Sequence, residues 1–294
     1  MDASIEHPVL ARPRADTPRD YSGPAIRAAN LEVRYRNRVV WTHATFDVEP
    51  GEFVAVIGPN GAGKTTLFRM LLGLHWPASG ALTVLGSAPQ RGNPRIGYVP
   101  QRHTIDRDTH LACDKLVRMA YPGSPWGPGH RFRPTPWGPR LRLTEEREAA
   151  EHALADVGAT DLANKSLGSL SGGELQRIFL AEALVGNPDM LLLDEPLSNL
   201  DLRRSRELVE TIHGLVVSRG VTTLLVAHDI NPMIKCLDKV IYIANGKVAT
   251  GRPDEVLSSE RLTALYGVRV EVLRDSRNNI VIVGGEDERG EEGA

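Results

Sequence analysis

The stretch Phe53-Val-Ala-Val-Ile-Gly-Pro-Asn-Gly-Ala-Gly-Lys-Thr-Thr66 decides the fold. Its first part, Phe53 to Ile57, is an apolar run with β-branched side chains, which is typical of a buried strand. A glycine-rich turn follows, and the pattern from Lys64 to Leu74 is helical. Strand, turn and helix in this order predict one unit of a mainly parallel sheet that helices cover on both faces.

The turn has the spacing of a phosphate-binding loop. Residues 58–65 fit the pattern Gly-x-x-x-x-Gly-Lys-Ser/Thr, directly after a strand and before a helix. Glycines let the backbone wrap around an anion, and the helix N-terminus adds partial positive charge. Lys64 is expected to reach the β- and γ-phosphates of ATP, and the Thr65 hydroxyl to bind Mg²⁺. The residues expected to bind the nucleotide here are Gly58, Pro59, Asn60, Gly61, Ala62, Gly63, Lys64, Thr65 and Thr66.

A second apolar run, Met190 to Leu193, ends in two acids, Asp194 and Glu195. Ligands of parallel sheets bind where strands end at their carboxyl termini. Asp194 is therefore expected to hold Mg²⁺, and Glu195 to polarise the attacking water as general base. Alone, the pair could equally be a solvated strand end, but the phosphate loop upstream favours function.

The rest of the pattern supports an α/β fold. We expect short antiparallel strands near the start, a helical insertion over about 101–167 with a long loop from Tyr121 to Leu141, and a hairpin near the end. The predicted elements are strands at 31–35, 38–41, 190–193, 222–227, 240–244 and 247–250, and helices at 116–119, 145–157, 172–185 and 203–219.

Composition sets limits on function. The chain of 294 residues has a formal net charge of -2, which gives no reason to expect nucleic acid. Its two cysteines suggest neither a disulfide framework nor a zinc site. No stretch reaches the length of about 20 apolar residues that crosses a bilayer, so a membrane role would need a partner subunit. We expect a disordered extension at 1–25, one nucleotide-binding domain at 26–272, and a hairpin end with an acidic tail at 273–294.

Residues Leu170-Ser-Gly-Gly-Glu-Leu-Gln-Arg177 resemble the signature of ATP-binding cassette proteins. The signature is a helix N-terminus, where Ser171, Gly172 and Gly173 present a hydroxyl and amides to a phosphate. The resemblance implies a P-loop NTPase core of the RecA type, with the signature carried by the helical insertion. It also implies a head-to-tail homodimer in which this segment binds the ATP of the partner chain. Glu174 departs from the family's usual Gln, and we expect a small effect on that nucleotide.

Four further segments resemble family motifs in the family's order. Tyr35 resembles the aromatic residue that stacks on adenine. Gln101 resembles the glutamine that touches Mg²⁺ and the attacking water. Asp201 ends the segment Ser198-Asn-Leu-Asp201, which resembles the loop that crosses the dimer interface. His228 resembles the histidine that contacts the γ-phosphate and holds Glu195 in place.

Finer resemblance favours importers of zinc or manganese. It lies in the stretch Arg95 to Arg102 with Ile105-Asp106, and in the tail from Val240 to Gly267. The implied partners are membrane permease subunits and, indirectly, an extracytoplasmic substrate-binding protein; the implied location is the cytoplasmic face of the membrane. Residues 107–111 lack the aromatics of that subfamily, and siderophore and cobalamin importers share much of the tail, so they remain an alternative. An iron-sulfur assembly ATPase is a further one.

Overall fold

The structure is a computed structural model of the chain. It describes residues 21–35, 38–101, 106, 108–122, 138–198, 200–276 and 279–284, and for residues 35, 38 and 138–143 the backbone alone. None of the helices in these ranges combines the length and apolar character that a membrane-spanning segment needs.

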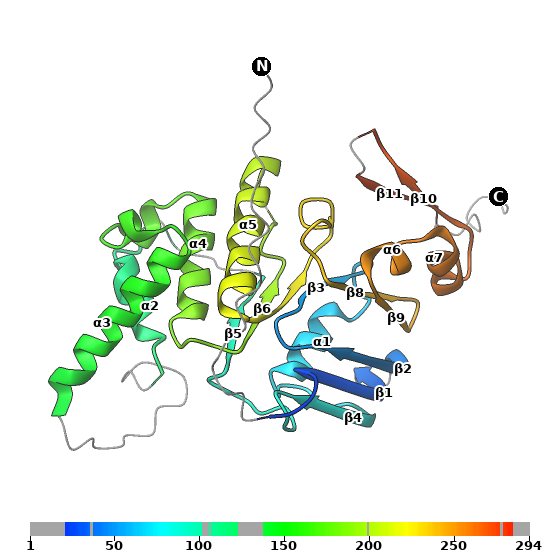
Figure 1. Cartoon of the computed structure of the whole chain (residues 1–294), viewed down its shortest axis with the longest axis horizontal. Coiled ribbons are helices and arrows are strands. Elements are labelled where there is room, and N and C mark those ends of the chain that lie inside the picture. Colours follow the sequence, from blue (N-terminus) through cyan, green and yellow to red (C-terminus); the bar gives the residue numbers. More distant parts are fainter. Residues whose placement is uncertain are drawn as a thin grey trace.

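A six-stranded sheet forms the centre of the molecule, in the order β5-β6-β7-β3-β8-β9 (Figure 1). The strands are β3 (Phe53–Ile57), β5 (Ile96–Val99), β6 (Met190–Asp194), β7 (Thr222–Val226), β8 (Lys239–Ala244) and β9 (Lys247–Gly251). Neighbours from β5 to β8 run parallel, and β9 returns antiparallel to β8. Every residue of β3, β6 and β7 is buried. The prediction of a mainly parallel sheet covered on both faces is therefore confirmed.

A second sheet has three antiparallel strands in the order β2-β1-β4. They are β1 (Ile26–Tyr35), β2 (Arg38–Val48) and β4 (Ser79–Val84). The two short strands predicted at 31–35 and 38–41 are confirmed as parts of β1 and β2. The sequence pattern does not predict β4, because only Leu82 and Val84 of this strand are buried and the apolar alternation is too short to stand out.

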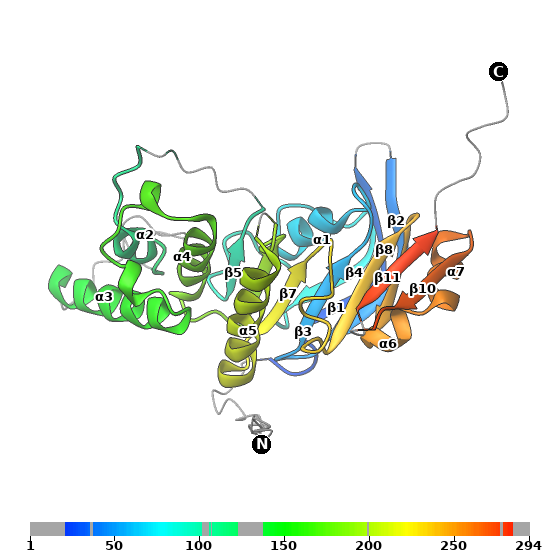
Figure 2. The same cartoon turned by 90° about the horizontal axis from the view of Figure 1, so that it is seen from above.

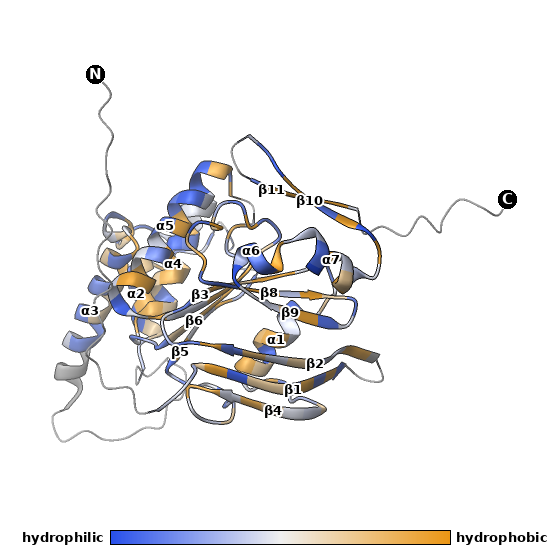
Figure 3. Cartoon of the chain, turned by 45° about the vertical axis from the view of Figure 1, so that its right-hand side comes forward, coloured by the Kyte–Doolittle hydropathy of each residue, from blue (hydrophilic) through white to orange (hydrophobic). Residues whose placement is uncertain are grey.

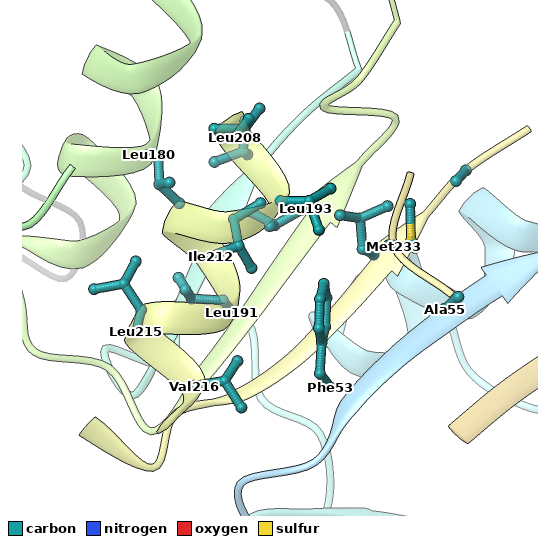
Figure 4. Close-up of a cluster of buried hydrophobic side chains, with 14 of the residues drawn as sticks. Phe53, Ala55, Leu180, Leu191, Leu193, Leu208, Ile212, Leu215, Val216 and Met233 are labelled. Carbon is teal, nitrogen blue, oxygen red and sulfur yellow. The ribbon is translucent and has the colours of Figure 1, made fainter. Parts of the chain in front are cut away.

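Alternate side chains of β3 enter two separate apolar cores. Val54 and Val56 pack with α1 (Lys64–Leu71) and the antiparallel sheet; Figure 3 shows α1 between the two sheets. Phe53 points the other way, into a core that the sheet shares with α5 (Leu202–Arg219). Figure 4 shows that core, in which the labelled residues of α5 are Leu208, Ile212, Leu215 and Val216. The end of β3 is thereby fixed from both faces.

Three helices lie beyond β5, apart from α1 in both views (Figures 1 and 2). They are α2 (Cys113–Met119), α3 (Gly138–Asp156) and α4 (Gly172–Leu184), with short 3₁₀ turns at Thr160–Leu162 and Leu167–Ser169. Helices α2 and α3 both pack on α4, so the predicted helical insertion is confirmed as an element of the fold. The predicted loop, however, is wrong over 138–141, where α3 has already begun. Pro139 suits the first turn of a helix. Residues 123–137 of that loop lie outside the described ranges.

The helix predicted from Lys64 to Leu74 ends at Leu71. The chain leaves it through Gly73, whose φ is +66°. A Cβ on Gly73 would lie 2.6 Å from the backbone nitrogen of Arg91, so both the turn and the close approach require glycine. The helix is shorter than its apolar pattern because the chain turns at Gly73, where the backbone of Gln90 and Arg91 packs against it.

The predicted C-terminal hairpin is confirmed as β10 (Val270–Arg274) and β11 (Ile280–Gly284), after the short helices α6 (Pro253–Val256) and α7 (Ser259–Tyr266). The Asn231 side chain ties β11 to the loop after β7. Its Oδ1 accepts from the Ile280 N–H at 2.7 Å, and its Nδ2 donates to the Ile280 carbonyl at 3.0 Å. The disordered extension predicted at 1–25 lies outside the described residues over 1–20. It is wrong over the described residues 21–25, because Ala25 is buried and its carbonyl accepts from the Leu85 N–H at 2.7 Å. The predicted acidic tail from 285 lies outside the described residues.

The core between α5 and the sheet gives a matched stability test. Leu215 is 4% exposed, whereas Leu202 on the same helix is 54% exposed. Leu215→Ala should lower the free energy of unfolding by about 2–5 kcal/mol because it opens a cavity. Leu202→Ala should change it by less than about 1 kcal/mol. Urea unfolding measures both; equal losses would show that this core does not hold α5 on the sheet.

Candidate active site

The phosphate loop joins β3 to α1, and glycine is required at its start. Gly58 has φ of +144°, and a Cβ there would lie 2.0 Å from the Ile243 carbonyl oxygen of β8. Gly63, at the N-cap of α1, has φ of +105°, and its Cβ would lie 2.8 Å from the Trp41 indole nitrogen. The loop is therefore pressed between β8 and the antiparallel sheet. The sequence does not predict that Trp41 packs against the phosphate loop, because this contact joins segments that are distant in the sequence.

Lys64 lies in the first turn of α1 and is 6% exposed. Its Nζ donates to the carbonyls of Gly58 at 2.7 Å and Pro59 at 3.0 Å. Burial lowers the pKa of Lys64, and the carboxylates of Glu195 and Asp194 partly oppose that shift. The ammonium group therefore sits over the loop within the field of two acids, where an anionic phosphate would offer it better partners than the carbonyls.

Asp194 ends β6 and is 2% exposed. Within the described part of the chain, its Oδ1 is buried without a hydrogen-bond partner. Burial raises the pKa of Asp194 to about 6; the charge of Glu195 adds to the shift, and Lys64 opposes it. A buried oxygen without a donor is costly unless a cation neutralises it. The residues present fit Mg²⁺, which prefers carboxylate and hydroxyl oxygens, with Asp194 and the exposed Thr65 as protein ligands.

Glu195 follows Asp194 with a left-handed backbone, φ +54°. Such a conformation is uncommon outside glycine and is often found at functional sites. The Glu195 Oε2 accepts from Nε2 of Gln101 at 2.6 Å, and Oε1 lies 2.8 Å from Nε2 of His228. The carboxylate is 13% exposed. The three residues come from the ends of adjacent strands β5, β6 and β7, and the structure brings them together.

The segment from Ser198 to Asp201 follows Glu195 and is hydrogen-bonded to its backbone. The Ser198 hydroxyl donates to the Glu195 carbonyl at 2.8 Å. Asp201 caps α5, because its Oδ1 accepts from the Arg204 N–H at 2.9 Å. The exposed Asp201 side chain lies at the start of α5, and Asn199 lies outside the described residues.

The signature segment begins α4 with a capping box. Ser171 Oγ accepts from the Glu174 N–H at 3.4 Å, and Glu174 Oε2 accepts from the Ser171 N–H at 2.9 Å. These bonds, with Lys165 Nζ 3.1 Å from Oε1, lower the pKa of Glu174 to about 2. The ionised Glu174 carboxylate thus caps the backbone N–H of Ser171. The position of Glu174, third in the helix after Ser171, could have predicted this role. The segment borders a pocket of about 380 Å³ that Arg177 and Arg204 also line.

The sequence-predicted residues thus fall into two groups. Pro59, Asn60, Gly61 and Ala62 lie in the loop around Lys64, and Thr65 and Thr66 in the first turns of α1. Ser171, Gly172, Gly173 and Glu174 lie at the start of α4, and no hydrogen bond or ion pair among the described residues joins them to the loop. Tyr35 ends β1, and its side chain is outside the described part. The expectation that the two motifs act on different nucleotides agrees with this separation but stays a prediction.

Comparisons with known proteins find a matching family and similar proteins. The family model described as ABC transporter matches residues 41–198. The manganese transport system ATP-binding protein MntB of Bacillus subtilis is 34% identical over 250 residues, covering 85% of this chain and 95% of that protein. The zinc import ATP-binding protein ZnuC of Jannaschia sp. is 33% identical over 242 residues, covering 82% and 88%.

Solved structures give the same result. An ABC transporter of the metal-chelate type, in an inward-facing conformation, matches with a TM-score of 0.71 and 27% identity, covering 89% of this chain and 98% of that one. CbiO1 of Clostridium perfringens, part of the ABC transporter complex CbiONQ, has a TM-score of 0.67 at 24% identity, covering 83% and 94%, and supports the fold.

The phosphate loop offers a test with a matched control. Gly58 and Gly61 both have positive φ, but only Gly58 lacks room for a Cβ. Gly61→Ala should cost about 1–3 kcal/mol through backbone strain. Gly58→Ala adds the overlap with the Ile243 carbonyl and should lower the melting temperature further and abolish binding of a fluorescent ATP analogue. Similar melting and binding curves for the two variants would contradict this packing of the loop.

Proposed function

Because the chain belongs to the ABC transporter family, we propose that it is the ATP-hydrolysing subunit of a transporter that imports a transition-metal ion, zinc or manganese, through a partner permease. The observation that supports hydrolysis most directly is Glu195, held between Gln101 and His228 beside the buried Asp194. The proposed location is the cytoplasmic face of the membrane, where the subunit binds peripherally to the permease.

Each residue at the sheet edge has a proposed part in the reaction. The loop amides and Lys64 bind the β- and γ-phosphates of ATP, and Tyr35 stacks on the adenine. Asp194 and Thr65, together with Gln101, would hold Mg²⁺, which would neutralise charge on the phosphates. Glu195 orients the attacking water and accepts its proton. His228 keeps the carboxylate in position and contacts the γ-phosphate.

The second half of each site comes from another copy of the chain. The start of α4, with Ser171, Gly172 and Gly173, can bind a phosphate, yet in this chain α4 lies apart from α1, which begins at Lys64 (Figure 2). We therefore propose a head-to-tail homodimer with two ATP molecules at the interface, which Asp201 and its loop help to form. ATP closes the dimer, and hydrolysis with product release opens it.

The metal-ion cargo is supported by the relatives that cover most of this chain, which are named for manganese transport and zinc import. Selection of the ion would fall to the permease and to an extracytoplasmic binding protein. One observation favours a second candidate, an importer of metal chelates such as siderophores or cobalamin, because the similar solved transporter is of the metal-chelate type. Its 27% identity is lower than that of the manganese and zinc relatives, so the ion remains the first choice.

The catalytic proposal predicts a separation of binding from hydrolysis. Glu195→Gln should lower ATP turnover by at least about a hundredfold, because it removes the general base, while ATP binding is retained. The variant should accumulate as an ATP-bound dimer in size-exclusion chromatography. The exposed Glu210 on α5 supplies the control, Glu210→Gln, which should keep full activity. Unchanged turnover in Glu195→Gln would remove Glu195 from the base role.

The cargo proposal predicts a metal deficit. Cells without this gene, grown at limiting zinc or manganese, should contain several-fold less of one of these ions by elemental analysis. The wild-type gene should restore the content, and the Glu195→Gln gene should not. Normal zinc and manganese together with lost uptake of a ferric siderophore or cobalamin would favour the second candidate.

A further inference from the structure

The loop after β7 carries His228 and then turns into the core. The Ala227 N–H donates to the Val56 carbonyl of β3 at 3.2 Å, which fixes the chain just before His228. After His228, the side chains of Ile230 and Met233 are buried in the core that the sheet shares with α5. Apolar contacts are not directional, so they hold this part of the loop against the core without fixing its orientation.

The Asn231 side chain supplies directional bonds to the C-terminal hairpin. Its Oδ1 accepts from the Ile280 N–H at 2.7 Å, and its Nδ2 donates to the Ile280 carbonyl at 3.0 Å; these two bonds are called the Asn231 clamp below. Nδ2 also donates to Oδ1 of Asp229 at 2.8 Å, and the same oxygen accepts from the Asn231 N–H at 2.9 Å. An amide has the donor and the acceptor of a peptide group, so Asn231 binds the edge of β11 as a neighbouring strand would.

The hairpin end of the clamp is fixed independently of the central sheet. Ile280 is 5% exposed and packs in the same core as the loop, and the N–H and carbonyl of a buried residue need partners. Among the described strands, β10 and β11 pair only with each other, and the hairpin lies beside α7 (Figures 1 and 2). On α7, the Thr263 hydroxyl accepts from the Val270 N–H at 3.0 Å and donates to the Val270 carbonyl at 3.2 Å. The hairpin therefore has one two-bond attachment to α7 and another to the loop that carries His228.

We propose that Asn231 is a positioning residue for His228: by binding the Ile280 backbone, it fixes the loop that places the His228 imidazole against the Glu195 carboxylate. The inference rests on the proposed function, in which that carboxylate accepts a proton from the attacking water. Nε2 of His228 lies 2.8 Å from Oε1 of Glu195, and the His228 side chain is 49% exposed. An imidazole that is half exposed depends on its backbone for its position, and this backbone lies between the bond to β3 and the Asn231 clamp. The C-terminal hairpin thereby contributes to the geometry of the active site.

The first test separates turnover from nucleotide binding. Asn231→Ala removes the clamp, and Asn231→Asp keeps the shape of the side chain but loses the Nδ2 donor. Both variants should lower the kcat of ATP hydrolysis by about tenfold, because a small displacement of groups around the reacting atoms is costly. Both should bind a fluorescent ADP analogue with the affinity of the wild type, since the phosphate loop is unchanged and ADP lacks the γ-phosphate. The kcat is measured at a temperature at which circular dichroism shows each variant to be folded.

Thr263→Val is the matched control, because it removes the other two-bond attachment of the hairpin and leaves the Asn231 clamp in place. It should lower the melting temperature to a similar degree as Asn231→Ala and keep the kcat of the wild type. If Thr263→Val lowers kcat as much as Asn231→Ala, loosening of the hairpin in general explains the loss and the proposal is overturned. A lower melting temperature with unchanged kcat in both Asn231 variants would also overturn it, since Asn231 would then act on stability alone.

A double-mutant cycle with His228→Ala separates the inference from the proposed function. Because Asn231 acts through His228, Asn231→Ala should lower kcat about tenfold in the wild-type chain and change it little in the His228→Ala chain, as measured by release of labelled phosphate from ATP. An equal loss in both backgrounds would overturn the inference and leave the proposed function intact. If His228→Ala itself keeps the turnover of the wild type, the proposed role of His228 fails and the inference falls with it.

Discussion

The contacts of the Glu195 carboxylate with Gln101 and His228 depend on the order of three strands. β5, β6 and β7 are adjacent and parallel, so their carboxyl ends meet at one edge of the sheet. Gln101, Glu195 and His228 follow these ends. The Glu195 carboxylate lies 2.6 Å from Nε2 of Gln101 and 2.8 Å from Nε2 of His228. β3 is the next strand, and it delivers the phosphate loop to the same edge. The two cores on either side of β3 keep this edge fixed.

Oε2 of Glu195 accepts a hydrogen bond from Gln101, and Oε1 lies 2.8 Å from Nε2 of His228, so both carboxylate oxygens have a neighbour in this arrangement. Gln101 follows β5, and His228 begins the loop that the Asn231 clamp joins to β11. The contacts around the carboxylate therefore extend from the edge of the sheet to the C-terminal hairpin.

Sequence could predict the phosphate loop and the acidic pair because they follow strands with strong local patterns, whereas Gln101, which follows β5, is predicted only from the family resemblance. The runs before Gly58 and Asp194 are apolar and buried, and their motifs have fixed spacing. What sequence could not supply are contacts between distant segments. Position 58 requires glycine because the Ile243 carbonyl lies against it. Position 73, just after α1, requires glycine because the Arg91 backbone lies against it. β4 and β5 lack a pattern long enough to recognise, and α3 begins inside a Pro-rich stretch that predicts loop. The bonds between Asn231 and Ile280 become visible only when the hairpin is placed beside the loop after β7.

The central claim is that one ATP site requires the phosphate loop of one chain and the signature of another. Mixing two inactive variants tests it most directly: Lys64→Ala destroys the loop, and Ser171→Arg destroys the signature. A mixed head-to-tail dimer contains one site with both halves intact, so a 1:1 mixture should regain about a quarter of wild-type ATP turnover if the two sites act independently. Each variant alone should stay inactive. A mixture that remains as inactive as its parts would contradict a site shared between chains.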